Sequence, residues 1–385
     1  MNFAKRKSLR GEPPFRMNRN MTGTKKYRRV VVKIGSNVLT AADGSLDTDR
    51  IATLVGQVAA LVRGGVEVIV VSSGAVASGR SIVKTNGRLD NVSARQLYSA
   101  VGQAKLINIY FDLFSACGIL CGQVLTTKEN FASRRHYLNQ RNCMEVMLAN
   151  GVVPVVNEND TISVTELMFT DNDELSGLVA TMMGADALVL LSNVDGIYDG
   201  DPASGTAQVI RRVTQGEEAI GDYIQPTRSN FGRGGMLTKS RIAMKVAGEG
   251  IEVIIANGKR EDILPALVLR GEDVLCTRFV PAPKPMSGVK KWIAHSDGFA
   301  KGEIHINEGA YGALQQPKAT SLLYVGVSEI NGEFEKDDIV KIVAPGGKVI
   351  GVGKVSAESA KARAMIGRKG ARPLIHYDYL HLDIP

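Results

Sequence analysis

The sequence has little cysteine and no hydrophobic run long enough to cross a membrane. Its four cysteines, at positions 117, 121, 143 and 276, form no CxxC pair, so neither a zinc ribbon nor a redox dithiol is indicated. We expect reduced thiols in a cytoplasmic protein. No apolar run approaches the roughly 18 residues that a membrane-spanning helix needs. The five histidines are scattered without an HExxH pattern, so a histidine-ligated metal is not expected.

Positive charge is missing from a long central stretch. Between Arg141 and Arg211 there is no lysine or arginine. The acidic residues of this stretch are Glu145, Glu158, Asp160, Glu166, Asp171, Asp173, Glu174, Asp186, Asp195, Asp199 and Asp201. Carboxylates that converge at strand ends require cations. We expect these to be lysines from both ends of the domain, a magnesium ion and the ammonium group of a substrate.

The net charge of +8 would suggest a nucleic-acid partner, but it is concentrated at one end of the chain. Residues 1–29 carry ten basic side chains and one acidic one, Glu12, so the remainder is close to neutral. This segment lacks the apolar core of a signal peptide. We expect residues 1–27 to be a disordered basic tail rather than a transit peptide, with Met17 or Met21 as alternative starts.

The 385 residues are enough for two domains. Apolar runs at 30–34, 66–71, 119–125, 151–157, 187–191 and 251–256 alternate with helical patterns at 47–63, 93–117, 133–149, 172–183, 236–250 and 261–269. Such alternation predicts an α/β fold over residues 28–280, with three α/β/α layers and an open, mainly parallel sheet. Residues 161–169 predict a hairpin-like excursion. A proline-rich linker, 281–288, precedes short strands at 289–385 that predict a small β-barrel.

Small or polar residues follow four of the predicted strands, at 33–36, 72–75, 157–160 and 192–196. In open α/β sheets the ligand lies outside the carboxyl ends of the strands. Glycine and serine there let backbone N–H groups approach an anion. Singly, such residues more often mark tight turns, but four in one sheet favour a phosphate ligand.

A fifth glycine cluster, residues 231–239, runs into a predicted helix and ends in Lys239. It has neither the Walker A spacing nor the GxGxxG order, and the alternative is a flexible loop with a solvated lysine. Lys33 lies near the end of an apolar strand, where a buried ammonium must find an anion. Both lysines would suit a migrating phosphoryl group, and the carboxylates would orient them.

Six segments resemble the glutamate 5-kinases, which join an amino-acid kinase domain to a C-terminal PUA domain. They are residues 32–37, 71–76, 156–160, 169–176, 194–198 and 234–239. The Asn-Glu-Asn-Asp and Asp-Asn-Asp motifs are the most particular of these. The resemblance implies ATP-dependent phosphorylation of the side-chain carboxylate of L-glutamate to γ-glutamyl phosphate, the first step of proline biosynthesis. It also implies Mg²⁺ as the cofactor, without indicating a protein ligand for it.

The resemblance also implies residue roles. Lys33 and Lys239 would stabilise transition-state charge, and Asp171, with Asp173, would organise them. Glutamate would be bound by Ser73, Asp160 and Asn172. ATP would be bound by Lys33, Ser192, Asn193, Arg233, Gly234, Gly235, Met236, Leu237, Thr238 and Lys239. Asn193 and Arg233 replace the family's usual Asp and Thr. We expect Glu166 to lie on a lid or regulatory segment.

Partners are likewise implied by the resemblance. It implies a homo-oligomer, dimer or tetramer, inhibition by proline at or near the glutamate site, and handover of product to glutamyl phosphate reductase. Residues 281–385 carry 14 basic and 11 acidic side chains, a weak footprint for nucleic acid, so we favour a structural or regulatory role over RNA binding. The alternatives are an aspartate or acetylglutamate kinase, or an RNA-binding protein with a retired kinase domain.

Overall fold

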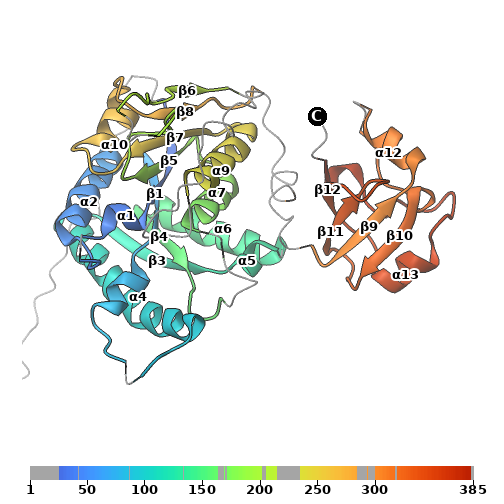
Figure 1. Cartoon of the computed structure of the whole chain (residues 1–385), viewed down its shortest axis with the longest axis horizontal. Coiled ribbons are helices and arrows are strands. Elements are labelled where there is room, and N and C mark those ends of the chain that lie inside the picture. Colours follow the sequence, from blue (N-terminus) through green and yellow to red (C-terminus); the bar gives the residue numbers. More distant parts are fainter. Residues whose placement is uncertain are drawn as a thin grey trace, which may run out of the picture.

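The computed structural model describes residues 26–382, except 42, 86, 133, 164–168, 170, 202–204, 215–234, 284–292, 294–299 and 317–318. An α/β unit comes first, and a smaller β unit follows it (Figure 1). Among the described residues, none of the helices has the length and apolar character that a membrane span requires.

A sheet of eight strands lies at the centre of the first unit, in the order β3-β4-β2-β1-β5-β7-β8-β6. Its strands are β1 Arg29–Ile34, β2 Glu67–Ser72, β3 Leu120–Thr126, β4 Val152–Glu158, β5 Ala187–Ser192, β6 Arg212–Val213, β7 Glu252–Asn257 and β8 Thr277–Phe279. The strands from β3 to β7 are parallel. β8 runs antiparallel to β7, and β6 pairs parallel with β8. The predicted open, mainly parallel sheet is therefore confirmed.

Helices cover both faces of this sheet (Figure 1). They are α1 Ser36–Leu39, α2 Thr48–Arg63, α3 Ala75–Arg80, α4 Asn91–Ala116, α5 Lys128–Ala132, α6 Arg134–Ala149, α7 Asn172–Met183, α9 Met236–Gly248 and α10 Ile263–Pro265. One apolar cluster packs α2, α4 and α10 against the sheet. A second packs α6, α7 and α9 against the other face. Three layers result, as the sequence predicts.

Strand β1 directs alternate side chains to the two apolar clusters on opposite faces of the sheet. Val30 and Val32 belong to the first cluster and Val31 to the second, because successive side chains of a strand point to opposite faces. Lys33 follows in the register of Val31. Its side chain is therefore directed to the face covered by α7 and α9, at the carboxyl end of the strand.

Several local predictions need correction. The short helices α1 and α3, which follow β1 and β2, are not among the helices predicted from the sequence. The predicted helix 261–269 is shorter, since a π-helical turn, Ala266–Arg270, follows α10. Pro265 lacks the N–H that a regular helix would use there. Most of the predicted excursion at 161–169, with Glu166, lies outside the described residues.

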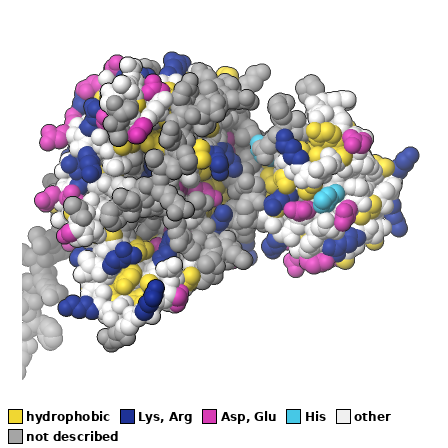
Figure 2. Space-filling model, viewed as in Figure 1, with side chains coloured by type: hydrophobic (Ala, Val, Ile, Leu, Met, Phe, Trp, Pro, Cys, Tyr) yellow, Lys and Arg dark blue, Asp and Glu magenta, His cyan; other side chains and the backbone are white. Residues whose placement is uncertain are grey.

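The second unit has its own apolar core. Its strands, in the order β10-β9-β11-β12-β13, are β9 Gly302–Ile306, β10 Val327–Gly332, β11 Ile339–Val343, β12 Val349–Lys354 and β13 Leu380–Leu382. Helices α12 Glu308–Leu314 and α13 Ser359–Ala364 accompany them. The predicted small β domain is confirmed as a five-stranded, mixed sheet. Charged side chains of both signs are interspersed on its visible face (Figure 2).

The first described residues belong to the folded body. Tyr27, which we assigned to the tail, is 3% exposed, and its hydroxyl donates to Glu252 at 2.8 Å. Lys26 forms an ion pair with the same carboxylate at 3.0 Å. The segment before β1 is therefore held against the start of β7. Residues 1–25 lie outside the described part of the chain.

Candidate active site at the carboxyl edge of the sheet

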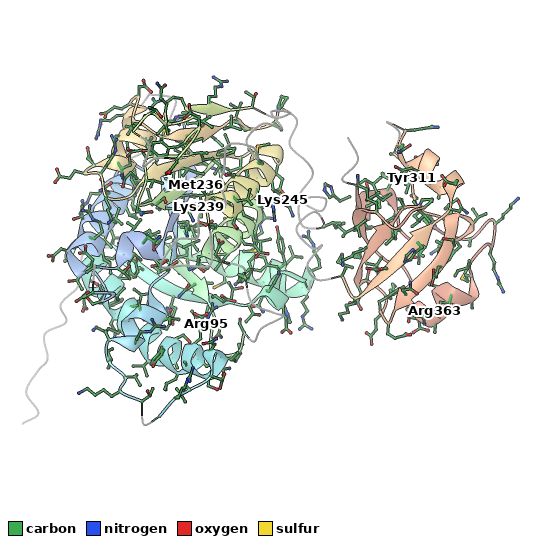
Figure 3. All side chains as sticks on the ribbon, in the orientation of Figure 1. Arg95, Met236, Lys239, Lys245, Tyr311 and Arg363 are labelled. Atoms are coloured by element: carbon green, nitrogen blue, oxygen red, sulfur yellow. The ribbon has the colours of Figure 1, made fainter. Side chains whose placement is uncertain are left out.

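Asp173 joins two lysines that are far apart in the sequence. Its Oδ1 lies 2.7 Å from Lys33 Nζ, at the end of β1. Its Oδ2 accepts from Lys239 Nζ at 2.7 Å, in the first turn of α9. Asp173 is fully buried and Lys33 is 4% exposed. One carboxylate thus fixes two ammonium groups at the same edge of the sheet; Lys239 is labelled in Figure 3.

The start of helix α7 places Asp173 there. Asp171 is the N-cap residue, and its Oδ1 accepts from the backbone N–H groups of Asp173 and Glu174 at 2.9 and 3.1 Å. A capping carboxylate satisfies N–H groups that have no partner in the helix. The sequence prediction assigned the organisation of the lysines to Asp171 together with Asp173. Asp173 forms the ion pairs with both lysines, whereas Oδ1 of Asp171 accepts from the first N–H groups of the helix.

The two aspartates have opposite pKa shifts. Burial raises the pKa of Asp171 to about 6, and the neighbouring charge of Asp173 adds to this effect. Burial also acts on Asp173, but Lys33 and Lys239 outweigh it and lower its pKa to about 2. Asp173 is therefore ionised at neutral pH, whereas Asp171 titrates near pH 6. At neutral pH Asp171 is therefore mostly ionised as well, and the two carboxylates balance the charges of Lys33 and Lys239.

A hydrogen-bonded chain of polar side chains extends from the same helix terminus toward α4. Asn172 Nδ2 donates to Ser73 Oγ at 2.9 Å and to Asn157 Oδ1 at 3.0 Å. Asn157 Nδ2 in turn donates to Gln103 Oε1 at 2.8 Å. Two of the three predicted glutamate-binding residues, Ser73 and Asn172, are thereby brought together. Asn157, from the Asn-Glu-Asn-Asp motif, and Gln103, which was not singled out from the sequence, join them.

Asp160, the third of these residues, has a different partner. Its Oδ1 accepts from Arg95 Nε at 2.7 Å and lies 2.5 Å from Arg95 Nη2. The same Nη2 donates to Glu158 Oε2 at 2.9 Å. Glu158, Asp160 and Gln103 line a cavity of about 280 Å³ between α4, β3 and the end of β4. The cavity thus adjoins the chain of polar side chains through Gln103.

The remaining predicted nucleotide-binding residues lie at the end of β5 and at the start of α9, on the side of Lys33 away from α4. Ser192 ends β5, and its Oγ donates to Asn193 Oδ1 at 3.4 Å. Its carbonyl accepts from the N–H of Gly258, just after β7. Gly235 is the N-cap of α9, and Met236, Leu237, Thr238 and Lys239 form its first turn. Arg233 and Gly234 lie outside the described residues, so the glycine loop is seen only at its end.

Sequence reasoning missed the arginines that pair with the central carboxylates. The pairs are Arg29 with Glu145 at 2.8 Å, Arg95 with Glu158 and Asp160, and Arg260 with Asp195 at 2.8 Å. The expectation of lysines from both ends of the domain is correct for Asp173 but incomplete for the others. The sequence carried no clear signal for Arg95, which lies in the second turn of α4.

The described residues include no group of three or more His, Cys, Asp or Glu side chains that could hold a metal ion. A magnesium ion that arrives with phosphates keeps several waters and needs one or two carboxylates at most. Asp171 fits this requirement. Its Oδ2 is buried and has no hydrogen-bond partner among the described residues, and it is available to accept from a metal-bound water.

Comparisons with known proteins match both units of the chain. The model of the amino acid kinase family matches residues 28–257, and that of the PUA domain matches residues 302–377. A glutamate 5-kinase of Bacteroides thetaiotaomicron is 60% identical over 93% of this chain and 99% of its own length. One from Chlorobaculum tepidum is 48% identical over 92% of this chain and 98% of its own. The solved structure of a Bacillus anthracis UMP kinase covers 66% of this chain and 96% of its own, at 18% identity and a TM-score of 0.46.

The family and domain matches span both folded units, and the named relatives are aligned over almost their whole length. The chain is therefore a kinase, and it belongs to the amino acid kinase family as a member of the glutamate 5-kinases that carry a PUA domain.

Proposed function

We propose that this enzyme transfers the γ-phosphoryl group of ATP to the side-chain carboxylate of L-glutamate, giving ADP and γ-glutamyl phosphate, the first step of proline biosynthesis. The observation that carries the proposal is the pair of lysines held by Asp173 at the carboxyl edge of the sheet. The names of the relatives supply the choice of amino acid.

The chemistry requires positioning and charge neutralisation more than proton transfer. A carboxylate oxygen of glutamate attacks the γ-phosphorus, and the bond to the β,γ-bridging oxygen breaks. The attacking carboxylate is already ionised at neutral pH, so no general base is needed. Negative charge is spread over the transferring phosphoryl oxygens. Lys33 and Lys239 stabilise that charge, because Asp173 holds both ammonium groups in place before the substrates bind.

The amino acid binds on the α4 side of the lysines in this proposal. Asp160 binds its ammonium group, and Ser73 and Asn172 bind its polar groups, through the chain that includes Asn157. ATP binds on the α9 side, over Ser192, Asn193 and the segment 233–239. The two substrates then meet above Lys33, which lies between these sides at the end of β1.

Magnesium supplies charge neutralisation on the ATP phosphates when it is bound. Among this chain's residues, Asp171 is suited to hold a metal-bound water through its buried Oδ2. Binding of such a cation nearby would favour the ionised form of Asp171 and lower its pKa from about 6.

A hydroxamate assay tests the proposed function. The enzyme is incubated with ATP, Mg²⁺ and hydroxylamine, which traps acyl phosphates, and with L-glutamate, L-aspartate or N-acetyl-L-glutamate in parallel. Product with L-glutamate, at least tenfold above the other two, is expected. Absence of product with L-glutamate contradicts the proposal, and product with aspartate or N-acetylglutamate instead would identify a different amino-acid kinase.

We further propose proline inhibition at or near the glutamate site, assembly as a dimer or tetramer, and handover of the labile product to a glutamyl phosphate reductase. One observation supports assembly. Strand β3 is an edge strand, and Leu120 on β3 and Phe111 on α4 are 57% and 49% exposed. An apolar edge of this kind is a surface that a second copy of the chain can cover.

A further inference from the structure

Arg95 is a guanidinium held between two buried carboxylates. Its side chain extends from the second turn of α4 to the end of β4, where Glu158 and Asp160 are 4% and 7% exposed. The side chain of Arg95 itself is 23% exposed. It lies on the α4 side of the first unit, whereas Lys239 lies on the α9 side (Figure 3).

Arg95 contacts one defined oxygen of the Asp160 carboxylate. Both Nε and Nη2 of Arg95 contact the same oxygen, Oδ1, at 2.7 and 2.5 Å. Two contacts from one rigid, planar group hold Oδ1 in place and so limit movement of the carboxylate. A lysine at this position would supply the positive charge but not the two N–H donors of a planar group.

Glu158 connects Arg95 to the segment that leads into α7. Its Oε2 accepts from Arg95, and its Oε1 accepts from the backbone N–H of Phe169 at 3.0 Å. Phe169 is buried, with its ring 5.9 Å from that of Phe131. Arg95 is therefore linked directly to Asp160, after the end of β4, and through Glu158 to the segment that precedes the cap residue Asp171.

We propose that Arg95 is a positioning residue for the amino-acid substrate, which holds the Asp160 carboxylate in place for the substrate's ammonium group. The inference rests on the proposed function, because it takes Asp160 as the ligand of that ammonium group. Arg95 is assigned no contact with the transferring phosphoryl group. Its loss should therefore affect KM for the amino acid and not kcat.

The charge of the Arg95 guanidinium also affects the ionisation of the neighbouring carboxylates. Two carboxylates so close together in a buried site oppose each other's ionisation. The charged groups that act on Glu158 are Asp160, from the same strand end, and Arg95, from α4. Burial raises the pKa of Glu158 and Asp160 adds to this, whereas the hydrogen bond from the Phe169 N–H and the charge of Arg95 lower it. Without Arg95 the pKa of Glu158 would rise further, and binding of an ammonium group at this site would weaken as the pH falls.

The test is steady-state kinetics of Arg95→Gln in the full-length protein, with Lys105→Gln as the matched control. Lys105 is an exposed residue of the same helix, so its change removes an equal charge. We expect Arg95→Gln to raise KM for L-glutamate by about ten- to 100-fold, with kcat and KM for ATP within about threefold of wild type. The acid limb of kcat/KM for L-glutamate should move to higher pH. Lys105→Gln should show none of these changes.

Each outcome bears on the inference. An unchanged or lower KM for L-glutamate in Arg95→Gln overturns it, as does a loss of kcat/KM that is equal at every pH. If Arg95→Gln fails to fold, Arg95→Lys decides, and a smaller rise in the same KM supports the inference whereas an unchanged KM overturns it. A wild-type enzyme that gives no hydroxamate with L-glutamate contradicts the proposed function itself.

Discussion

A carboxylate that is wholly excluded from water stays ionised only if cations lie close to it, and Asp173 has two. Lys33 and Lys239 each lie 2.7 Å from one of its oxygens. Breaking a buried pair by removing one partner commonly costs about 3–5 kcal/mol. The lysines are thus held firmly, which is what a site that acts through fixed charge requires.

The neighbouring Asp171 gives a pH prediction. Its pKa is raised to about 6, so below that pH the carboxyl is protonated and loses the charge that we expect to act on the metal and the lysines. We predict that kcat/KM for ATP, measured with saturating L-glutamate, falls about tenfold per pH unit below pH 6.

Asp171→Asn provides the control for this fall in kcat/KM at acid pH. Asparagine also caps helices, so α7 should form, while the group that titrates is gone. Lower activity that no longer depends on pH between about 5 and 7 is expected. An acid limb that persists unchanged in Asp171→Asn would show that another group titrates.

The sequence predicted the lysine–aspartate centre but not the Arg95 contacts, and the reason is one of distance along the chain. Lys33 and Lys239 were conspicuous because each stands where a structural lysine would be poorly placed. Arg95 lies 63 residues before Glu158, on a helix whose polar face predicts only solvent contact. Its partners are decided by the packing of α4 beside β4, which periodicity does not reveal.

At the scale of elements, two glycines allow helices α3 and α4 to cross closely. A Cβ at Gly102 would lie 1.8 Å from the carbonyl oxygen of Ala75, and one at Gly79 would lie 1.8 Å from that of Tyr98. Helix α3 follows the Ser73 segment, and α4 carries Arg95 and Gln103. The close crossing therefore sets the position of one side of the substrate site relative to the other.

We predict that Gly102→Ala separates these helices. The added methyl group overlaps backbone that cannot turn aside, so overpacking should lower the free energy of unfolding by about 1–3 kcal/mol. It should also raise KM for L-glutamate more than KM for ATP, since ATP is assigned to the α9 side. Urea denaturation and steady-state kinetics measure both effects. Gly56→Ala on α2, where a Cβ meets nothing within 4 Å, is the control, and similar behaviour of the two variants contradicts the prediction.

Regular elements were predictable and short ones were not. Apolar runs located the strands β1, β2, β4, β5 and β7, because fully buried strands need apolar residues on both faces. Helices α1 and α3 span only four and six residues, too few for a periodic pattern to emerge. Strands β6 and β8, of two and three residues, escaped prediction for the same reason.

At the scale of the whole molecule, the site lies within one unit. Every described residue to which we assign a role in binding or phosphoryl transfer belongs to the α/β unit. The β unit has its own core, although its Ile339 and Val352 belong to the second apolar cluster of the α/β unit. We predict that a chain ending at residue 299 retains kcat within about threefold of the full-length enzyme, because phosphoryl transfer depends on local positioning. Kinetics of the truncated and full-length proteins check this. A loss of tenfold or more would assign the PUA domain a part in catalysis.

The central claim is that the two lysines held by Asp173 stabilise the transferring phosphoryl group. The most direct test is kcat of Lys239→Ala at saturating ATP, Mg²⁺ and L-glutamate, with Lys245→Ala on the same helix as the control and circular dichroism to verify the fold. We expect a loss of about 10²- to 10³-fold for Lys239→Ala and little change for Lys245→Ala. A folded Lys239→Ala enzyme with the kcat of the wild type would contradict it.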